Sequence, residues 1–233
     1  MPRQARLDAP GTLQHVMVRG IDGLELFRDD QDREDIISRI SQLVESTGAK
    51  IIAWALMNNH VHILIFSGHQ GISKFMRCLL TGYAITYNRK YQRSGHLFQN
   101  RYKSVVCEEE GYLLELVRYI HLNPLRGSIV KSIKELGDYP WSGHAFLMGK
   151  RQNGWQEIEY VLRQFRGERR TAIQAYREFI AEGKYQGRRE DLVRGGFVRG
   201  LRGWLQVLSP RGKKETVEHD LHILGRGDFV ARI

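Results

Sequence analysis

The chain has 233 residues and a mass of 27.1 kDa, which suits one large domain or one domain with an appendage. Its formal net charge of +10 and pI near 9.7 are compatible with a polyanionic partner such as nucleic acid. Two cysteines are too few for a disulfide framework, and no apolar run approaches the roughly 20 residues of a membrane span, so we expect a cytoplasmic protein with no membrane partner.

The first part of the chain predicts a strand, a helix and a hairpin. Residues 12–19 alternate as a strand does, and residues 29–45 carry apolar side chains at helical spacing, with Gly48 as the stop. Residues 50–57 and 60–66 are typical of two strands, and Asn58 and Asn59 between them tolerate a tight turn.

A helix, a strand and a further helix are predicted next. Residues 72–91 keep a helical spacing, residues 103–108 suit a strand, and a helical pattern surrounds Tyr119. We expect this last helix to end at Asn123, because the proline that follows disfavours helical backbone there. The order of elements is typical of an α+β fold with a ferredoxin-like antiparallel sheet.

A polar, glycine-flanked segment at 149–154 predicts a boundary between a domain of residues 1–149 and an extension of residues 150–233. The extension holds 18 Lys or Arg against 11 Asp or Glu, so it is basic. Residues 158–166, 171–182 and 200–208 suit helices, while residues 185–199 are rich in Gly and Arg and predict irregular structure. We therefore expect a basic, mainly helical extension that binds DNA.

Two histidines one residue apart, His60 and His62, lie on the second strand of the predicted hairpin. A strand with this spacing points both imidazoles to one face, where two nitrogen donors suit a divalent metal. Among nine histidines such a pair arises by chance in about one chain of this length in three. Structural histidines are therefore the alternative when the pair is taken alone.

A phenol and an amide recur on one face of the predicted helix around Tyr119. Glu115, Tyr119 and Asn123 are four residues apart and so lie one turn from one another. From the residues alone, Tyr119 also suits a half-buried packing residue, and Asn123 suits a helix cap as well as a metal ligand. Glu115 is a second choice for ligating a metal or orienting water.

The segment from Gly68 to Cys107 contains seven Lys or Arg and no Asp or Glu. Such a run is either an ordinary solvated face or a DNA track, in which cations contact phosphates while aromatic and polar side chains contact bases. The predicted DNA-binding residues are Arg89, Lys90, Arg93, His96, Phe98, Gln99, Arg101, Tyr102 and Lys103, joined from the N-terminal side by Arg3, Arg6 and Arg19.

Five segments in order along residues 1–148 resemble the single-tyrosine HUH transposases. They are Pro2 to Arg6, His15 to Gly20, Met57 to His62, Gly95 to Tyr102 and Tyr119 to Pro124. The N-terminal Pro-Arg-Gln-Ala-Arg and the basic extension are most similar to the REP-associated tyrosine transposase branch of that family. Asn58 stands where relatives often have proline, a difference that we expect to alter only the turn.

The resemblance implies a metal-dependent endonuclease that cleaves and rejoins single-stranded, hairpin-associated DNA through a 5′-phosphotyrosine intermediate. It implies Tyr119 as the nucleophile and His60, His62 and Asn123 as ligands of Mg²⁺ or Mn²⁺. Tailed relatives of this kind suggest a monomer, whereas shorter relatives pair into dimers. A non-catalytic DNA- or RNA-binding protein on the same fold is the alternative, and a phosphodiesterase that activates water is the third.

Overall fold

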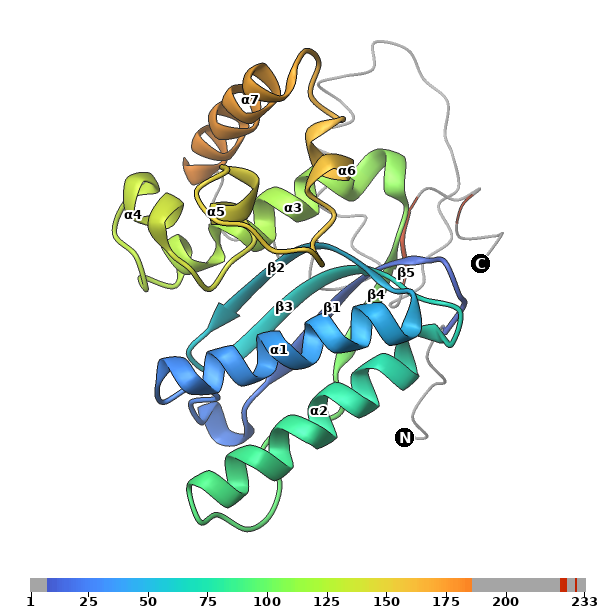
Figure 1. The fold of residues 1–233 in the computed structure, drawn as a ribbon, viewed down its shortest axis with the longest axis vertical. Helices are drawn as coiled ribbons and strands as arrows, with labels where there is room; N and C mark the ends of the chain where they lie inside the picture. Colours follow the sequence, from blue (N-terminus) through green and yellow to red (C-terminus); the bar gives the residue numbers. More distant parts are fainter. Residues whose placement is uncertain (1–7, 186–222, 226–228, 230–233) are drawn as a thin grey trace, which may run out of the picture.

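The computed structural model describes residues 8–185, 223–225 and 229, and Figure 1 shows how they are arranged. Arg3 and Arg6, the predicted helix at 200–208 and all but the first residue of the predicted irregular segment at 185–199 lie outside the described residues. Within these ranges no helix combines the length and the apolar character needed to cross a membrane.

A five-stranded sheet separates two helical layers (Figure 1). Its order is β2-β3-β1-β4-β5, formed by β1 (Leu13–Arg19), β2 (Lys50–Met57), β3 (His60–Phe66), β4 (Lys103–Cys107) and β5 (Ile223–Leu224). The β1–β3, β1–β4 and β2–β3 pairs are antiparallel, and β5 joins β4 in parallel. The first four strands confirm the predicted ferredoxin-like α+β fold, and β5 adds a fifth strand from the C-terminal part of the chain.

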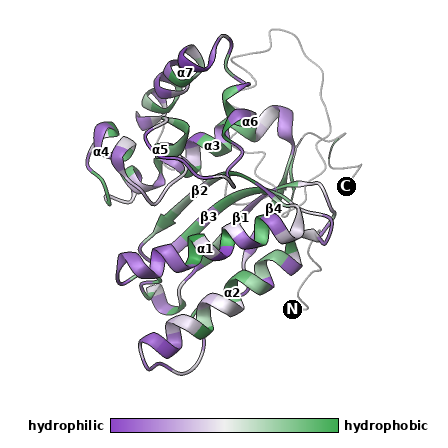
Figure 2. Ribbon diagram, in the orientation of Figure 1, coloured by the Kyte–Doolittle hydropathy of each residue, from purple (hydrophilic) through white to green (hydrophobic). Residues whose placement is uncertain are grey.

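One face of the sheet is covered by α1 (Asp30–Thr47) and α2 (Gly71–Lys90), with the short 3-10 turn η1 (Ile21–Gly23) at its end. The Asp29 carboxylate accepts a hydrogen bond from the Asp32 backbone N–H and so caps α1, and Gly48, at φ 67°, ends the helix as predicted. Buried apolar residues of the central strands, which Figure 2 colours as hydrophobic, form one cluster with residues of these two helices. Because side chains alternate between the two faces along β1 and β3, the histidines of these strands lie on the opposite face of the sheet.

The second face is covered by α3 (Glu109–Arg126) and by the helices packed around it. These are α4 (Ile133–Asp138), α5 (His144–Leu147), α6 (Ile158–Leu162), α7 (Arg169–Glu182) and the 3-10 turn η2 (Gly183–Tyr185). One hydrophobic cluster joins buried residues of the sheet, α3, α6 and α7. Residues 158–182 of the predicted extension therefore share a core with the first part of the chain.

The helix that carries Tyr119 extends further than its sequence predicts. It ends at Arg126, with Pro124 inside its last turn, so the expected end at Asn123 is wrong. Proline removes only one backbone N–H, and every residue from Leu116 to Pro124 is buried, so tertiary packing offsets the lost hydrogen bond. The extra turn adds Arg126 to the same helix face as Tyr119.

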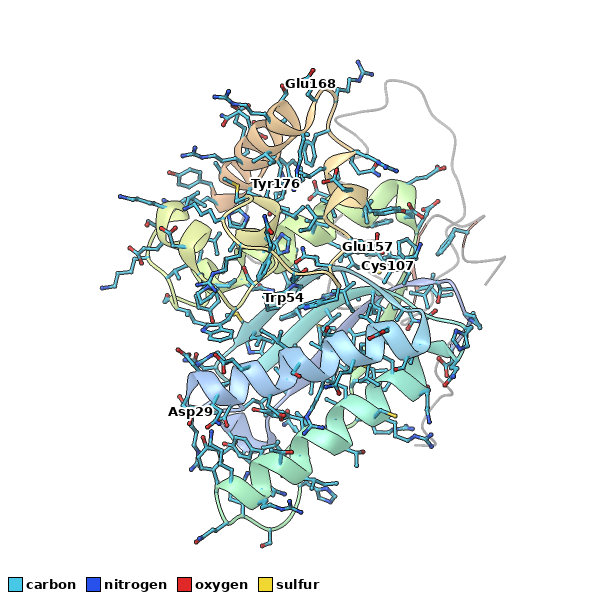
Figure 3. The ribbon with its side chains drawn as sticks, in the orientation of Figure 1. Asp29, Trp54, Cys107, Glu157, Glu168 and Tyr176 are labelled. Carbon is cyan, nitrogen blue, oxygen red and sulfur yellow. The ribbon has the colours of Figure 1, made fainter. Side chains whose placement is uncertain are left out.

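Tyr176 of α7, which is labelled in Figure 3, connects this helix to α3 and α5 through one buried histidine on each. Its hydroxyl lies 2.8 Å from His121 Nδ1 and 2.6 Å from His144 Nδ1. Burial raises the pKa of Tyr176 and lowers the pKa of both histidines, that of His144 to about 4, so all three groups are neutral. The hydroxyl therefore donates to one imidazole and accepts from the other.

We expect Tyr176→Phe to lower the free energy of unfolding by about 2–4 kcal/mol, because it leaves two buried ring nitrogens without a hydrogen-bond partner. Urea denaturation followed by circular dichroism measures this loss. Tyr185→Phe is the matched control, since the Tyr185 side chain is 85% exposed, and it should change the stability little. Equal stabilities of the two variants would contradict the prediction.

Candidate functional site

His60 and His62 lie on β3, on the face of the sheet that meets α3. In the ladder with β1, His62 is opposite Met17 and His60 is opposite Arg19. The two imidazole centroids are 5.1 Å apart, as expected for side chains two residues apart on a strand. The fold therefore places both rings together at the end of β3 that follows the tight turn.

Each of these histidines has its Nδ1 atom in a hydrogen bond. His60 Nδ1 lies 2.7 Å from the Asn59 side-chain oxygen, and His62 Nδ1 lies 3.0 Å from His15 Nε2. Because a carboxamide oxygen only accepts, His60 carries its proton on Nδ1 and presents a lone pair at Nε2. Burial, with the neighbouring His15 and His60, lowers the pKa of His62 well below its ordinary value, so its imidazole is neutral and able to ligate a cation.

Tyr119 lies directly across from these histidines on α3. Its ring centroid is 5.8 Å from that of His62 and 5.8 Å from that of His15, with the rings nearly perpendicular in both pairs. Only 6% of the Tyr119 side chain is exposed. The structure thus brings together, within one chain, the phenol and the histidine pair that the sequence singles out.

Asn123 follows Tyr119 by one helical turn and is also buried, with 8% of its surface exposed. Its side-chain nitrogen is buried and has no hydrogen-bond partner among the described residues. A buried amide is normally satisfied, and its nitrogen and oxygen are interchangeable by rotation, so this environment fits an oxygen turned toward a cation. Two imidazoles and one amide are thus a donor set that a divalent metal can use. Among the described residues, no group of three or more His, Cys, Asp or Glu forms a metal site.

The first part of the chain matches a known protein family. Residues 12–123 match the family described as "Transposase IS200 like". The match covers just under half of the chain, and over these residues the chain is similar to the IS200-like transposases. This similarity supports a DNA-processing role of the transposase class. No curated protein matches the chain.

Two solved structures resemble this chain. One is described as a REP-associated tyrosine transposase bound to a REP hairpin; it is 17% identical, with a TM-score of 0.54, and the match covers 72% of this chain and 93% of that chain. A provisionally named transposase from Deinococcus radiodurans R1 is 16% identical, with a TM-score of 0.35, over 49% of this chain and 93% of that chain. At its level of identity the first match shows a shared fold.

Two residues of the candidate site are not predicted from the sequence. His15 is fully buried on β1 and contacts both His62 and Tyr119. The Arg126 guanidinium carbon lies 5.7 Å from the Tyr119 ring centroid, and its Nη2 donates to the Gly183 carbonyl. Strand alternation places His15 on the same face as Arg19, which could have indicated its position; Arg126 is missed because the helix is expected to stop at Asn123.

Glu115, the second choice for ligating a metal or orienting water, forms an ion pair with Arg118 on its own helix. Its carboxylate accepts a hydrogen bond from Arg118, whose guanidinium stacks 4.2 Å from the Phe179 ring centroid on α7. This ion pair connects α3 to the C-terminal helices, so Glu115 has a structural role.

The loop before β4 lies against the histidine end of the sheet. The Gln99 backbone N–H donates to the Arg19 carbonyl, and the Ile21 N–H donates to the Leu97 carbonyl. Since Arg19 is opposite His60 in the ladder, this loop is held next to the site. The exposed members of the predicted DNA track are Arg19, Arg89, Lys90, His96, Gln99, Arg101 and Lys103, with Arg93 and Phe98 half-buried.

Two predicted DNA-binding residues have structural partners instead. Tyr102 is 6% exposed and its hydroxyl bonds to the Ser73 hydroxyl at 3.0 Å, so its ring is not accessible for stacking on a base. Lys90 bonds to the carboxylates of Asp29 and Asp32 at 2.8 Å. Although burial alone would lower the pKa of Lys90, these hydrogen bonds raise it above its ordinary value. Lys90 therefore joins the end of α2 to the start of α1.

Proposed function

We propose that this chain is a metal-dependent endonuclease and strand-transfer enzyme that cleaves and rejoins hairpin-associated, single-stranded DNA. The observation that carries the proposal is the placement of the Tyr119 ring 5.8 Å from His62 in the same chain, with Asn123 one turn away on the same helix. A phenol beside a neutral histidine pair and a buried amide supplies a nucleophile and a cation site together.

In the proposed reaction the Tyr119 oxygen attacks the phosphorus of the scissile phosphodiester. The Tyr119 hydroxyl loses its proton to solvent as a bond forms between its oxygen and phosphorus. The bond from phosphorus to the 3′ oxygen breaks, and the 3′ oxygen takes up a proton from solvent to leave as a hydroxyl. The DNA 5′ end is then held on Tyr119 as a phosphotyrosine, and attack by a 3′ hydroxyl reverses the step. Arg126, whose charge lies beside the Tyr119 ring, is placed to stabilise negative charge developing there.

His60, His62 and Asn123 would hold the divalent metal, Mg²⁺ or Mn²⁺. When bound, the metal would act as a Lewis acid toward the phosphate oxygens. Imidazole nitrogens favour transition metals, whereas phosphate chemistry in proteins commonly uses Mg²⁺, so both ions are to be assayed. Because Tyr119 and the histidines belong to one chain, we propose that a monomer is sufficient for cleavage.

The DNA partner is proposed from the exposed cations and polar side chains beside the site. A structure of similar fold is bound to a REP hairpin, and hairpin DNA is the substrate class that we propose here, by analogy with the REP-associated branch. Exposed Arg19, Gln99 and Arg101 adjoin the end of β1 that faces His60, so they suit the unpaired nucleotides next to a hairpin. The basic extension, proposed as residues 150–233, suits the duplex stem.

One assay tests the function. A labelled hairpin oligonucleotide is incubated with the full chain and Mn²⁺, and denaturing electrophoresis is used to detect a covalent adduct. We expect an adduct and a released 3′ hydroxyl, both dependent on metal. Cleavage without an adduct would instead support a water-activating phosphodiesterase, and tight binding without cleavage under either metal would support a non-catalytic binding protein.

Lys90 and Arg101 should differ in their effect on DNA binding. We expect Arg101→Met to weaken hairpin binding by about 3–10-fold and to reduce the salt dependence by about one counterion, because Arg101 is exposed and contacts phosphate in our proposal. Lys90→Met should change binding less than about twofold yet lower the unfolding temperature by a few degrees, because it removes the ion-pair partner of the buried Asp32 carboxylate. Fluorescence anisotropy and thermal unfolding measure both effects, and a larger binding loss for Lys90→Met would refute the distinction.

A further inference from the structure

His15 contacts the proposed site but is not one of the predicted metal ligands, which are His60, His62 and Asn123. It lies on the central strand β1, opposite Leu64 of β3 and Val105 of β4, and it is fully buried. Its ring stacks on that of His62 with centroids 5.3 Å apart and an angle of 23° between planes. Its Nε2 atom is 3.0 Å from His62 Nδ1, which is hydrogen-bonding distance.

A hydrogen bond between two imidazole nitrogens needs one donor and one acceptor. If His62 Nδ1 carries the proton, it donates to the lone pair of His15 Nε2, and His62 Nε2 then has a lone pair for a metal. If His15 Nε2 carries the proton, His62 must hold its own proton on Nε2, where a metal would otherwise bind. The direction of this one bond therefore decides whether His62 can be a ligand.

We propose that His15 is a positioning residue, which accepts the Nδ1 proton of His62 and so fixes His62 as an Nε2 ligand. The inference rests on the proposed function, since it concerns the metal held by His60, His62 and Asn123. His60 receives the same orientation from a different acceptor, the side-chain oxygen of Asn59 at 2.7 Å. Both imidazoles of the pair are thus held at Nδ1 by an acceptor within the fold, which is how metal-binding histidines are normally oriented.

The position of His15 explains why it serves as an acceptor and not as a ligand. Its Nε2 atom faces His62 Nδ1, on the side of that ring opposite to the nitrogen that would bind a metal. It also contacts the Tyr119 ring at 5.8 Å, edge to face, so one buried side chain touches both the histidine pair and the nucleophile. Removing it would loosen both at once.

Two substitutions separate accepting a hydrogen bond from filling space. His15→Gln keeps an acceptor oxygen at about the reach of Nε2, whereas His15→Leu keeps bulk and removes the acceptor. His144→Leu is the matched control, because His144 is similarly buried and hydrogen-bonded but lies on α5, bonded to Tyr176. All three variants are made in the full chain, and circular dichroism and thermal unfolding establish that each is folded.

The first measurement is the tautomer of His62 in the metal-free protein, by long-range ¹H–¹⁵N correlation spectroscopy, with His62→Asn identifying the signal. We expect the proton on Nδ1 in the wild type and in His15→Gln. A wild-type proton on Nε2 would overturn the proposal. This measurement requires neither metal nor DNA, so it tests the role of His15 even if the proposed function is wrong. Because it uses the wild type, it also remains possible if His15→Leu does not fold.

The second measurement is Mn²⁺ affinity, from the free-ion signal in electron paramagnetic resonance. We expect His15→Leu to bind Mn²⁺ at least about 10-fold more weakly than the wild type, and His15→Gln and His144→Leu to stay within about threefold. Equal affinities of folded His15→Leu and the wild type, or an equal loss in folded His15→Gln and His15→Leu, would overturn the proposal. A wild type that binds no Mn²⁺ would overturn the metal site itself.

Discussion

Tyr119→Phe is expected to abolish the covalent protein–DNA adduct and to reduce cleavage of a hairpin oligonucleotide by at least about 1,000-fold. The substitution removes only the nucleophilic oxygen. The ring keeps its edge-to-face contacts with His15 and His62 and its place beneath the Arg126 guanidinium, so the fold and the proposed metal ligands are retained. The loss should therefore appear in the rate of cleavage and leave the affinity for DNA within about threefold.

Single-turnover cleavage under saturating protein separates these two effects. Tyr112→Phe is a suitable control, since Tyr112 is half-buried near the start of the same helix and lies outside the site. An adduct formed by Tyr119→Phe at more than a tenth of the wild-type yield would show that another residue is the nucleophile. Cleavage without an adduct in the wild type would show that water attacks.

His60→Ala is expected to reduce metal-dependent cleavage by at least about 100-fold, because it removes one of the two imidazole donors. His60 is only partly buried, so this change should disturb the fold less than the loss of the buried His62. The measurement is cleavage rate against Mn²⁺ concentration. We expect the half-saturating concentration to rise strongly and the maximal rate to fall.

His69→Ala is the matched control for this loss. His69 is an exposed histidine that bonds to the Gln70 side chain, away from the ladder positions of the histidine pair. It should leave the metal dependence unchanged. A His60→Ala enzyme with a wild-type response to Mn²⁺ would exclude His60 from the metal site, and an equal loss in His69→Ala would indicate a general effect of removing histidines.

Local patterns predict most of the fold. Alternating side chains along 12–19 and 60–66 and helical spacing along 29–45 and 72–91 correspond to β1, β3, α1 and α2 to within one or two residues. The same periodicity places His60 and His62 on one face, because strand geometry alone decides that relation. These features depend on near neighbours in the chain.

Features that depend on distant segments could not be predicted. The contact between His15 and His62 depends on the register of β1 against β3, which brings together two residues that are 47 apart in the sequence. The continuation of α3 through Pro124 depends on burial by helices that follow it, and the pairing of Lys90 with Asp29 and Asp32 depends on how α1 lies beside α2. The strand β5, far along the chain from β4, has no local signal that would assign it to this sheet.

The burial of α3 between the sheet and the outer helices restricts how far this helix can move during a reaction cycle. Leu116, Ile120 and Leu122 on this helix are fully enclosed, and the outer helices belong to the same cluster. Handing the nucleophile to another copy would mean exposing that entire cluster to water, at roughly 25 cal/mol for each Å² of apolar surface. We therefore expect that, in the proposed reaction, the DNA ends move past a Tyr119 side chain that stays in place during cleavage and rejoining.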